Sequence, residues 1–191
     1  MKAVVTKVIN ASVTVDNKVI SQINNGLLAL IGISKDDTPA DLKLLVAKLL
    51  SLRIFESPDG QMWKASVKDV GGEILCGISL SASLSFLSQF TLQARTQRGT
   101  KPDFHMAMNP ADAQKMYDDC LAALGKNYDP SKIKDGAFGA MMQVASINDG
   151  PITIILDTKA TQVSSSASSS QTRTPNEAGT PNGQIQDSPG L

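Results

Sequence analysis

The chain has 191 residues, 41% of them hydrophobic, and its 18 basic residues balance 18 acidic ones. These totals favour one domain whose core needs no disulfide or metal, and the charge balance argues against broad wrapping of nucleic acid. A single histidine excludes His-rich metal sites, and Cys76 and Cys120 lack the spacing of a disulfide framework or zinc site. Without a transmembrane-length apolar run or a signal-peptide pattern, we expect a cytoplasmic protein that contacts no membrane.

Strand patterns dominate the first part of the chain. Residues 2–9 and 11–15 predict one bent strand or two short ones, and Asp16-Asn17 predicts a hairpin turn after them. A second turn is expected at Asn25-Gly26. The nearly continuous apolar run LLALIGI that follows is typical of a central strand.

Two helices are predicted from their caps and apolar stripes. Thr38 can cap the first, with Pro39 in its first turn and Asp41 completing a capping box. The second begins at Asn109-Pro110, and Gly125 is expected to end it. The apolar stripe of the second helix, which predicts packing against the core, comprises Ala113, Met116, Tyr117, Cys120, Leu121 and Leu124.

The remaining segments complete a fold of the α/β class in its α+β form. RIFESPDGQMW predicts a strand with a turn at residues 58–60, and FGAMMQVASI and PITIIL predict two strands separated by a turn at Gly150-Pro151. We expect a β-barrel-like sheet with two main helices packed against it, in a domain over residues 1–160. Residues 161–191 are rich in Ser, Thr, Pro and Gly, which predicts a disordered tail.

Two segments carry polar groups that could act on a substrate. In LSQFTL, read as a strand, Ser88 or Thr91 could donate to or attack a carbonyl, but neither has a nearby base, and polar residues that simply finish a strand are the alternative. The loop QARTQRGTKPDFH could hold a phosphate through Arg95, Arg98 and Lys101 and stack a base on Phe104, or it could be an ordinary solvated loop. His105 could be a general base or a surface histidine.

Seven segments resemble the D-aminoacyl-tRNA deacylase family, close to its fungal forms. They are ASVTVDNKVISQI, LSLRIFE, GGEIL, SQFTL, GTKPDFH, FGAMMQV and NDGPITIILD, in the family's order over roughly residues 1–158. SQFTL together with N-x-G-P-[VI]-T is highly specific. The resemblance implies a homodimeric β-barrel-like hydrolase that cleaves the ester between a D-amino acid, or glycine, and the terminal adenosine of tRNA. It implies no cofactor, no metal and no DNA partner.

The resemblance also implies roles for residues of this chain. In the family the Gly-Pro bond is cis, and its carbonyls reach into the partner subunit's pocket, where they reject an L side chain sterically. The implied chiral gate is Gly150 and Pro151, supported by Lys7, where the family usually has arginine, and by Asn148. The implied reaction centre comprises Ser88, Gln89, Phe90 and Thr91, and the implied contacts to the terminal adenosine are Phe104, Met142 and Lys101.

Two mechanisms are open under this resemblance. Thr91 is a candidate nucleophile in the family. We favour attack by water assisted by the ribose 2′-hydroxyl of the substrate, with backbone amides near Phe90 and Thr91 stabilising the oxyanion.

One segment departs from the family. The short link between GGEIL and SQFTL is extended here, which predicts an inserted loop over residues 76–86 unless the length is an error of gene prediction. If the insertion displaces residues 88–91, the alternative is a non-catalytic member of the family that binds nucleic acid or a protein partner.

Overall fold

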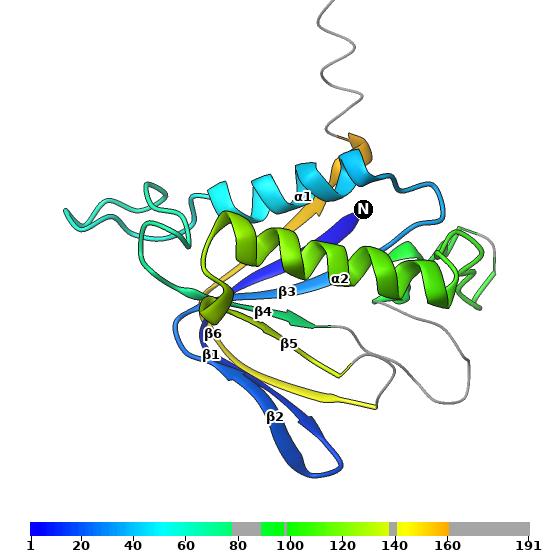
Figure 1. Ribbon diagram of the computed structural model, residues 1–191, viewed down its shortest axis with the longest axis horizontal. Coiled ribbons are helices and arrows are strands. Elements are labelled where there is room, and N and C mark those ends of the chain that lie inside the picture. The colour runs from blue at the N-terminus through cyan, green and yellow to red at the C-terminus, as the bar shows by residue number, and fades with distance from the viewer. Residues whose placement is uncertain (78–88, 98, 138–140, 161–191) are drawn as a thin grey trace, which may run out of the picture.

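The computed structural model describes residues 1–77, 89–97, 99–137 and 141–160 (Figure 1). The two helices lie side by side and cover one face of a mixed sheet. In chain order the elements are β1 (Lys2–Val15), β2 (Lys18–Ile23), β3 (Gly26–Gly32), α1 (Pro39–Ser51), β4 (Glu73–Gly77), η1 (Phe90–Gln93), α2 (Pro110–Asn127), η2 (Pro130–Lys132), β5 (Ile133–Asp135) and β6 (Gln143–Asp157).

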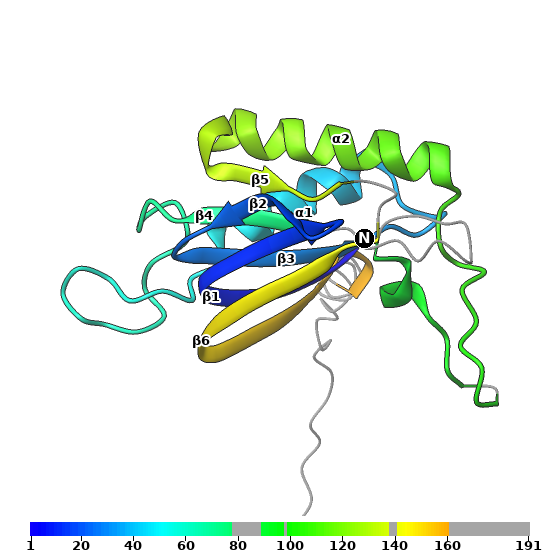
Figure 2. The same cartoon turned by 90° about the horizontal axis from the view of Figure 1, so that it is seen from below.

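The long strand β1 organises the sheet. It pairs antiparallel with β3 along its first half and with β2 along its second half. On its other edge β1 pairs antiparallel with β6, and Figure 2 shows β6 on the side of the molecule away from α2. The strands β3, β4 and β5 run parallel, and β2 approaches β4 and β5, which gives the sheet its barrel-like curl. The expected β-barrel-like α+β fold is confirmed.

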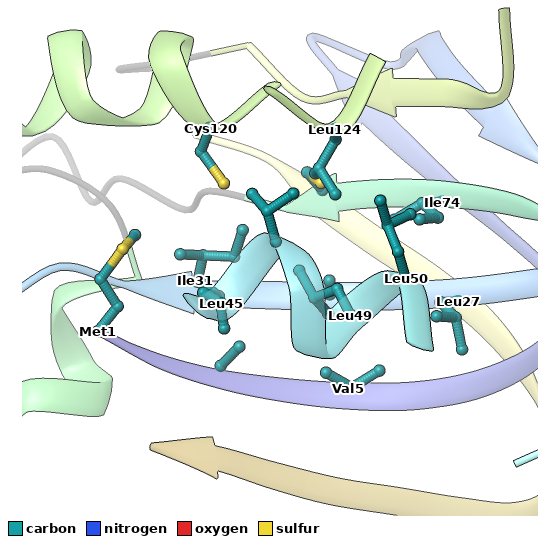
Figure 3. Packing of buried hydrophobic residues seen from close by; sticks show 14 of the residues in the cluster. Met1, Val5, Leu27, Ile31, Leu45, Leu49, Leu50, Ile74, Cys120 and Leu124 are labelled. Atoms are coloured by element: carbon teal, nitrogen blue, oxygen red, sulfur yellow. The ribbon is translucent and has the colours of Figure 1, made fainter. Parts of the chain in front are cut away.

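The main core lies between the sheet and the two helices (Figure 3). Alternate residues of β1 are buried, as the two-residue period of a half-covered strand requires. The apolar stripe of α1 packs in one cluster with Ala3 and Val5 of β1, and α2 lies beside α1 and completes the helical cover of this core. Residues that contribute to this cluster and are fully or almost fully buried include Val5, Leu27, Ile31, Leu45, Leu49, Ile74, Cys120 and Leu124.

A buried carboxylate joins three distant parts of the chain. Asp41 Oδ2 accepts hydrogen bonds from the backbone N–H of Thr38 at 2.9 Å and from Lys159 Nζ at 2.7 Å. Its Oδ1 accepts from the Thr158 hydroxyl at 2.7 Å, and that hydroxyl also accepts from the Met1 ammonium at 2.6 Å. Burial alone would raise the pKa of Asp41, but these hydrogen bonds outweigh burial and hold the pKa well below its usual range.

Most local signals in the sequence are confirmed. Thr38 and Asp41 form the expected capping box of α1, and Asn109 caps α2 through the backbone N–H of Asp112. The Asp16-Asn17 turn has both residues at positive φ, as a tight hairpin turn requires. The prediction that Gly125 ends the second helix is wrong, because α2 continues to Asn127. A Cβ at Gly125 would lie 3.5 Å from Pro130 Cα, an ordinary van der Waals distance, so η2 packs against the helix at this residue.

Two strand predictions are also wrong. RIFESPDGQMW forms no strand, because only a single bridge joins Phe55 to Ala65 beside the turn at residues 58–60. The two strands expected on either side of Gly150-Pro151 are one strand, β6.

The first two residues of the expected inserted loop are part of a strand. Cys76 and Gly77 belong to β4, where Cys76 pairs with Ala29 on one side and Asp135 on the other. The rest of the expected loop, residues 78–86, and the expected tail, residues 161–191, lie outside the described residues. Both cysteines are buried free thiols, and within the described ranges no helix is long and apolar enough to cross a membrane.

Candidate functional site

The segment from Gln89 to Gln93 is anchored to the end of β3 at both of its ends. The carbonyl of Ile31 accepts the backbone N–H of Gln89 at 3.0 Å. The carbonyl of Gly32 accepts the side-chain amide of Gln93, which is buried, at 3.0 Å. These two bonds fix the ends of η1 against the strand.

The expected strand at this segment is wrong, because residues 90–93 form the short 3₁₀-helix η1. Gly32 explains the difference. A Cβ on Gly32 would lie 2.8 Å from Leu92 Cβ and 3.0 Å from the Gln89 carbonyl oxygen, so η1 packs directly on the backbone of β3. Of the four residues expected at the reaction centre, the structure brings together Gln89, Phe90 and Thr91, while Ser88 lies outside the described residues.

Within the described residues the Thr91 hydroxyl contacts an amide rather than a base. Gln89 Nε2 donates a hydrogen bond to Thr91 Oγ1 at 2.5 Å, so the hydroxyl oxygen is an acceptor in this contact. Among the described residues no carboxylate or imidazole contacts that hydroxyl. A threonine without a base is a weak nucleophile at neutral pH.

Phe90 and Phe104 form one wall of a small cavity. Their ring centroids lie 4.8 Å apart with the planes at 73°, an edge-to-face contact. The cavity has a volume of about 370 Å³, within the range of small-molecule sites. Its lining comprises Phe90, Phe104, His105, Ala107, Met108, Asn109 and Pro110.

The second segment of the site is also held by the residues after β3. Met108 donates its backbone N–H to the carbonyl of Ile33 at 3.1 Å, and Lys35 donates its own to the carbonyl of Met106 at 2.9 Å. Ser34 and Ala107 form an antiparallel bridge between these bonds. The loop that carries Phe104 is therefore fixed to the same strand end that holds η1.

Asp103 orients the histidine that follows it. The carboxylate accepts the backbone N–H of His105 at 2.9 Å and also contacts the ring Nδ1 of His105. The backbone bond first, and then the ring contact, lower the pKa of Asp103. Asp103 is itself fixed, because its backbone exchanges hydrogen bonds of 2.8 and 3.0 Å with Arg95.

The ladder between β1 and β6 opens at the Gly-Pro sequence. Thr6 pairs with Thr153 and Val8 with Asn148, so residues 149–152 form a bulge opposite Lys7. The Gly150-Pro151 peptide bond is cis, as the family resemblance implies, and both residues are exposed.

An ion pair ties this bulge to β1. Lys7 Nζ lies 2.7 Å from Asp149 Oδ2, and the side chains of Lys7 and Asp149 are 11% and 39% exposed. The same ammonium lies 5.3 Å from the ring centroid of Phe55, a cation–π contact. Of the two residues expected to support the gate, Lys7 therefore contacts the bulge, and Asn148 flanks it while accepting a hydrogen bond from the Ser146 hydroxyl at 3.0 Å.

The other expected adenosine contacts lie apart from the cavity lining. Met142 packs against both hydrophobic clusters and beside Gly136, next to Val13. Lys101 is an exposed residue of the loop between Arg95 and Asp103. Of the three residues expected to contact adenosine, only Phe104 lines the cavity.

Three residues of these sites did not stand out in the sequence. Gln93 anchors η1, Asp103 orients His105, and Asp149 pairs with Lys7. The D-x-H spacing was a usable signal, because an aspartate often accepts the backbone N–H two residues later. In the part of the chain that the structure describes, no group of three metal-ligating side chains is found.

Comparisons with known proteins agree with this arrangement. A family model described as D-Tyr-tRNA(Tyr) deacylase matches residues 4–157. A D-aminoacyl-tRNA deacylase of Schizosaccharomyces pombe is 45% identical over 159 residues, 83% of this chain and 99% of the relative. A D-aminoacyl-tRNA deacylase of Saccharomyces cerevisiae is 48% identical over 157 residues, which cover 82% of this chain and 98% of the relative. A solved structure described as c-Myc DNA Unwinding Element Binding Protein is 48% identical with a TM-score of 0.75, covering 82% of this chain and 98% of that one.

Proposed function

Because the chain belongs to the D-Tyr-tRNA(Tyr) deacylase family, we propose that it hydrolyses the ester between a D-amino acid, or glycine, and the terminal adenosine of tRNA. The observation that carries this proposal is the cavity of about 370 Å³ beside η1. Its two aromatic rings offer an apolar surface for a purine, and unstacked RNA bases are commonly held in this way. With the terminal base in the cavity, the ester lies over η1.

The start of η1 supplies groups for the hydrolytic step. In a 3₁₀-helix the first backbone N–H groups have no acceptor within the helix, and here these belong to Phe90 and Thr91. Such donors stabilise the oxyanion that forms when an ester carbonyl is attacked. Because no carboxylate or imidazole of the described residues contacts the Thr91 hydroxyl, the nucleophile in this proposal is water, assisted by the 2′-hydroxyl of the substrate.

The bulge of residues 149–152 is the proposed chiral gate. Gly150 and Pro151 are exposed on it, and the Lys7–Asp149 ion pair restrains its backbone. A restrained backbone can reject an L side chain sterically, whereas attraction alone discriminates weakly between mirror-image substituents.

A homodimer completes the gate in this proposal. Among the described strands β6 pairs only with β1, so the other edge of this 15-residue strand is unpaired. Ile147 and Ile155 on β6 are 55% and 73% exposed, and Met141 just before it is 64% exposed. Long apolar edge strands are usually covered. A second copy of the chain would cover this one and receive the gate in its own cavity, in the cytoplasm where aminoacyl-tRNA is used.

A second function is suggested by one relative. The 48% identical structure is described as a DNA unwinding element binding protein, so a binding role without ester hydrolysis is the competing proposal for this chain. This binding role would be favoured if residues 78–88 displaced η1 from the position that hydrolysis requires. The two proposals differ in whether the protein turns over an aminoacyl-tRNA.

The test is hydrolysis of D-Tyr-tRNA and L-Tyr-tRNA by the full chain, with buffer as the control. We expect rapid release of D-tyrosine and protection of the L-ester. Release of D-tyrosine no faster than in buffer would refute the enzymatic proposal. Native mass measurement of the same sample tests the homodimer, and a monomer at assay concentration would contradict the cross-subunit gate.

A further inference from the structure

We propose that His105 is a substrate-binding residue of the cavity and that its Nε2 atom accepts a hydrogen bond from the 2′-hydroxyl of the terminal ribose. The inference rests on the proposed function, because it requires a nucleoside in the cavity. His105 lines this cavity together with Phe90 and Phe104, so a base held by the two rings brings its ribose near the imidazole.

The ring of His105 has a defined orientation. Asp103 contacts both its backbone N–H and its ring Nδ1, and the backbone of Asp103 is paired in both directions with Arg95. A turn closed by a 2.9 Å bond from the Ala107 N–H to the Phe104 carbonyl fixes the backbone on the other side. The side chain of His105 is 49% exposed, so orientation by Asp103, rather than burial, holds the ring.

This orientation decides which hydrogen bond Nε2 can make. An ionised carboxylate is only an acceptor, so the Nδ1 atom that contacts Asp103 carries the proton. In the neutral ring Nε2 is then an acceptor, and among the described residues no donor to Nε2 is found. An acceptor selects a hydroxyl rather than a phosphate. When the 3′ oxygen of the terminal ribose carries the ester, the 2′-hydroxyl is the ribose hydroxyl that remains.

Two substitutions distinguish the contact made by Nδ1 from the contact proposed for Nε2. In His105→Asn the amide reaches about as far as Nδ1 and can still contact Asp103, but no atom stands at the Nε2 position. In His105→Gln the longer side chain places an amide oxygen near the Nε2 position. His105→Asn therefore removes the proposed contact, and His105→Gln is the conservative variant expected to restore part of it.

The experiment measures the binding of adenosine and 2′-deoxyadenosine to the wild-type chain and both variants by NMR titration. Loss of the 2′-hydroxyl should weaken binding to the wild type by about 3- to 10-fold, as expected for one hydrogen bond. His105→Asn should bind the two nucleosides equally, and His105→Gln should recover part of the difference. An equal penalty in the wild type and in His105→Asn, or no binding of adenosine at millimolar concentration, would overturn the inference.

The hydrolysis of D-Tyr-tRNA by the same samples separates this inference from the proposed function. If the wild type hydrolyses D-Tyr-tRNA but His105→Asn prefers adenosine over 2′-deoxyadenosine as strongly as the wild type does, the role of His105 is refuted and the deacylase proposal stands. If His105→Asn loses the preference for adenosine but the wild type does not hydrolyse D-Tyr-tRNA, the nucleoside contact is supported and the deacylase activity is refuted.

Discussion

Replacing Thr91 by valine decides whether its hydroxyl is the nucleophile. Valine keeps the shape of the side chain and removes Oγ1, whose described contact is the 2.5 Å hydrogen bond from Gln89 Nε2. A net hydrogen bond contributes about 0.5 to 1.5 kcal/mol, which corresponds to a rate change of roughly 2- to 12-fold. Removal of a catalytic nucleophile instead costs about 10⁴-fold or more. We expect Thr91→Val to retain hydrolysis of D-Tyr-tRNA within about tenfold of the wild type.

The assay is single-turnover deacylation, so that product release does not mask the chemical step. Gln89→Met is the matched control, because it removes the other partner of the same hydrogen bond. If Thr91 acts only through that bond, the two single variants and the double variant should show similar small losses. A loss above 10³-fold in Thr91→Val, with Gln89→Met near the wild type, would refute the argument and make Thr91 the nucleophile.

Three further substitutions test the proposed gate, the hydrogen bonds of the Asp41 carboxylate and the packing of η1 on Gly32. Asp149→Asn leaves the nearly buried ammonium of Lys7 without its counter-charge, so hydrolysis of L-Tyr-tRNA relative to D-Tyr-tRNA should rise; an unchanged ratio in a competition assay would count against the gate. Asp41→Asn should lower the free energy of unfolding in urea by about 2 to 3 kcal/mol at pH 7. Because the folded pKa of Asp41 is depressed, this difference should be full above about pH 5 and should shrink as the pH falls below the unfolded value near 4. Gly32→Ala places a Cβ 2.8 Å from Leu92 Cβ, so it should displace η1 and reduce deacylation by more than about tenfold, and full activity would contradict the packing argument.

The elements that could be predicted from sequence are those whose signals are local. The capping box of α1 involves Thr38 and Asp41, three residues apart, and the cap of α2 is Asn109 next to a proline. The hairpin turn needs only two residues that tolerate positive φ. In each case both partners of the hydrogen bond lie within a few residues of each other, so the local sequence is enough to predict the interaction.

The elements that could not be predicted depend on distant partners. By propensity Gly150-Pro151 breaks a strand, yet β6 is continuous because both of its halves pair with β1 and the bulge lies opposite Lys7. Alternation in SQFTL predicted a strand, but Gly32 and Gln93 hold the segment as a 3₁₀-helix. Tertiary contacts outweighed local preference in both cases.

The candidate site shows the same division at the level of single atoms. Phe104 could be assigned to the site from sequence because an aromatic ring can stack a base, and Phe90 through the family resemblance. Their positions are set by the backbone carbonyls of Ile31, in β3, and of Ile33, just after it, and a carbonyl has no residue-specific signature. Because the two site segments are held by the end of β3 and the residues directly after it, a shift of that strand end would move η1 and the loop of Phe104 together. The spacing of the two aromatic rings is therefore a property of β3, and substitutions there should affect adenosine binding without touching the nucleoside.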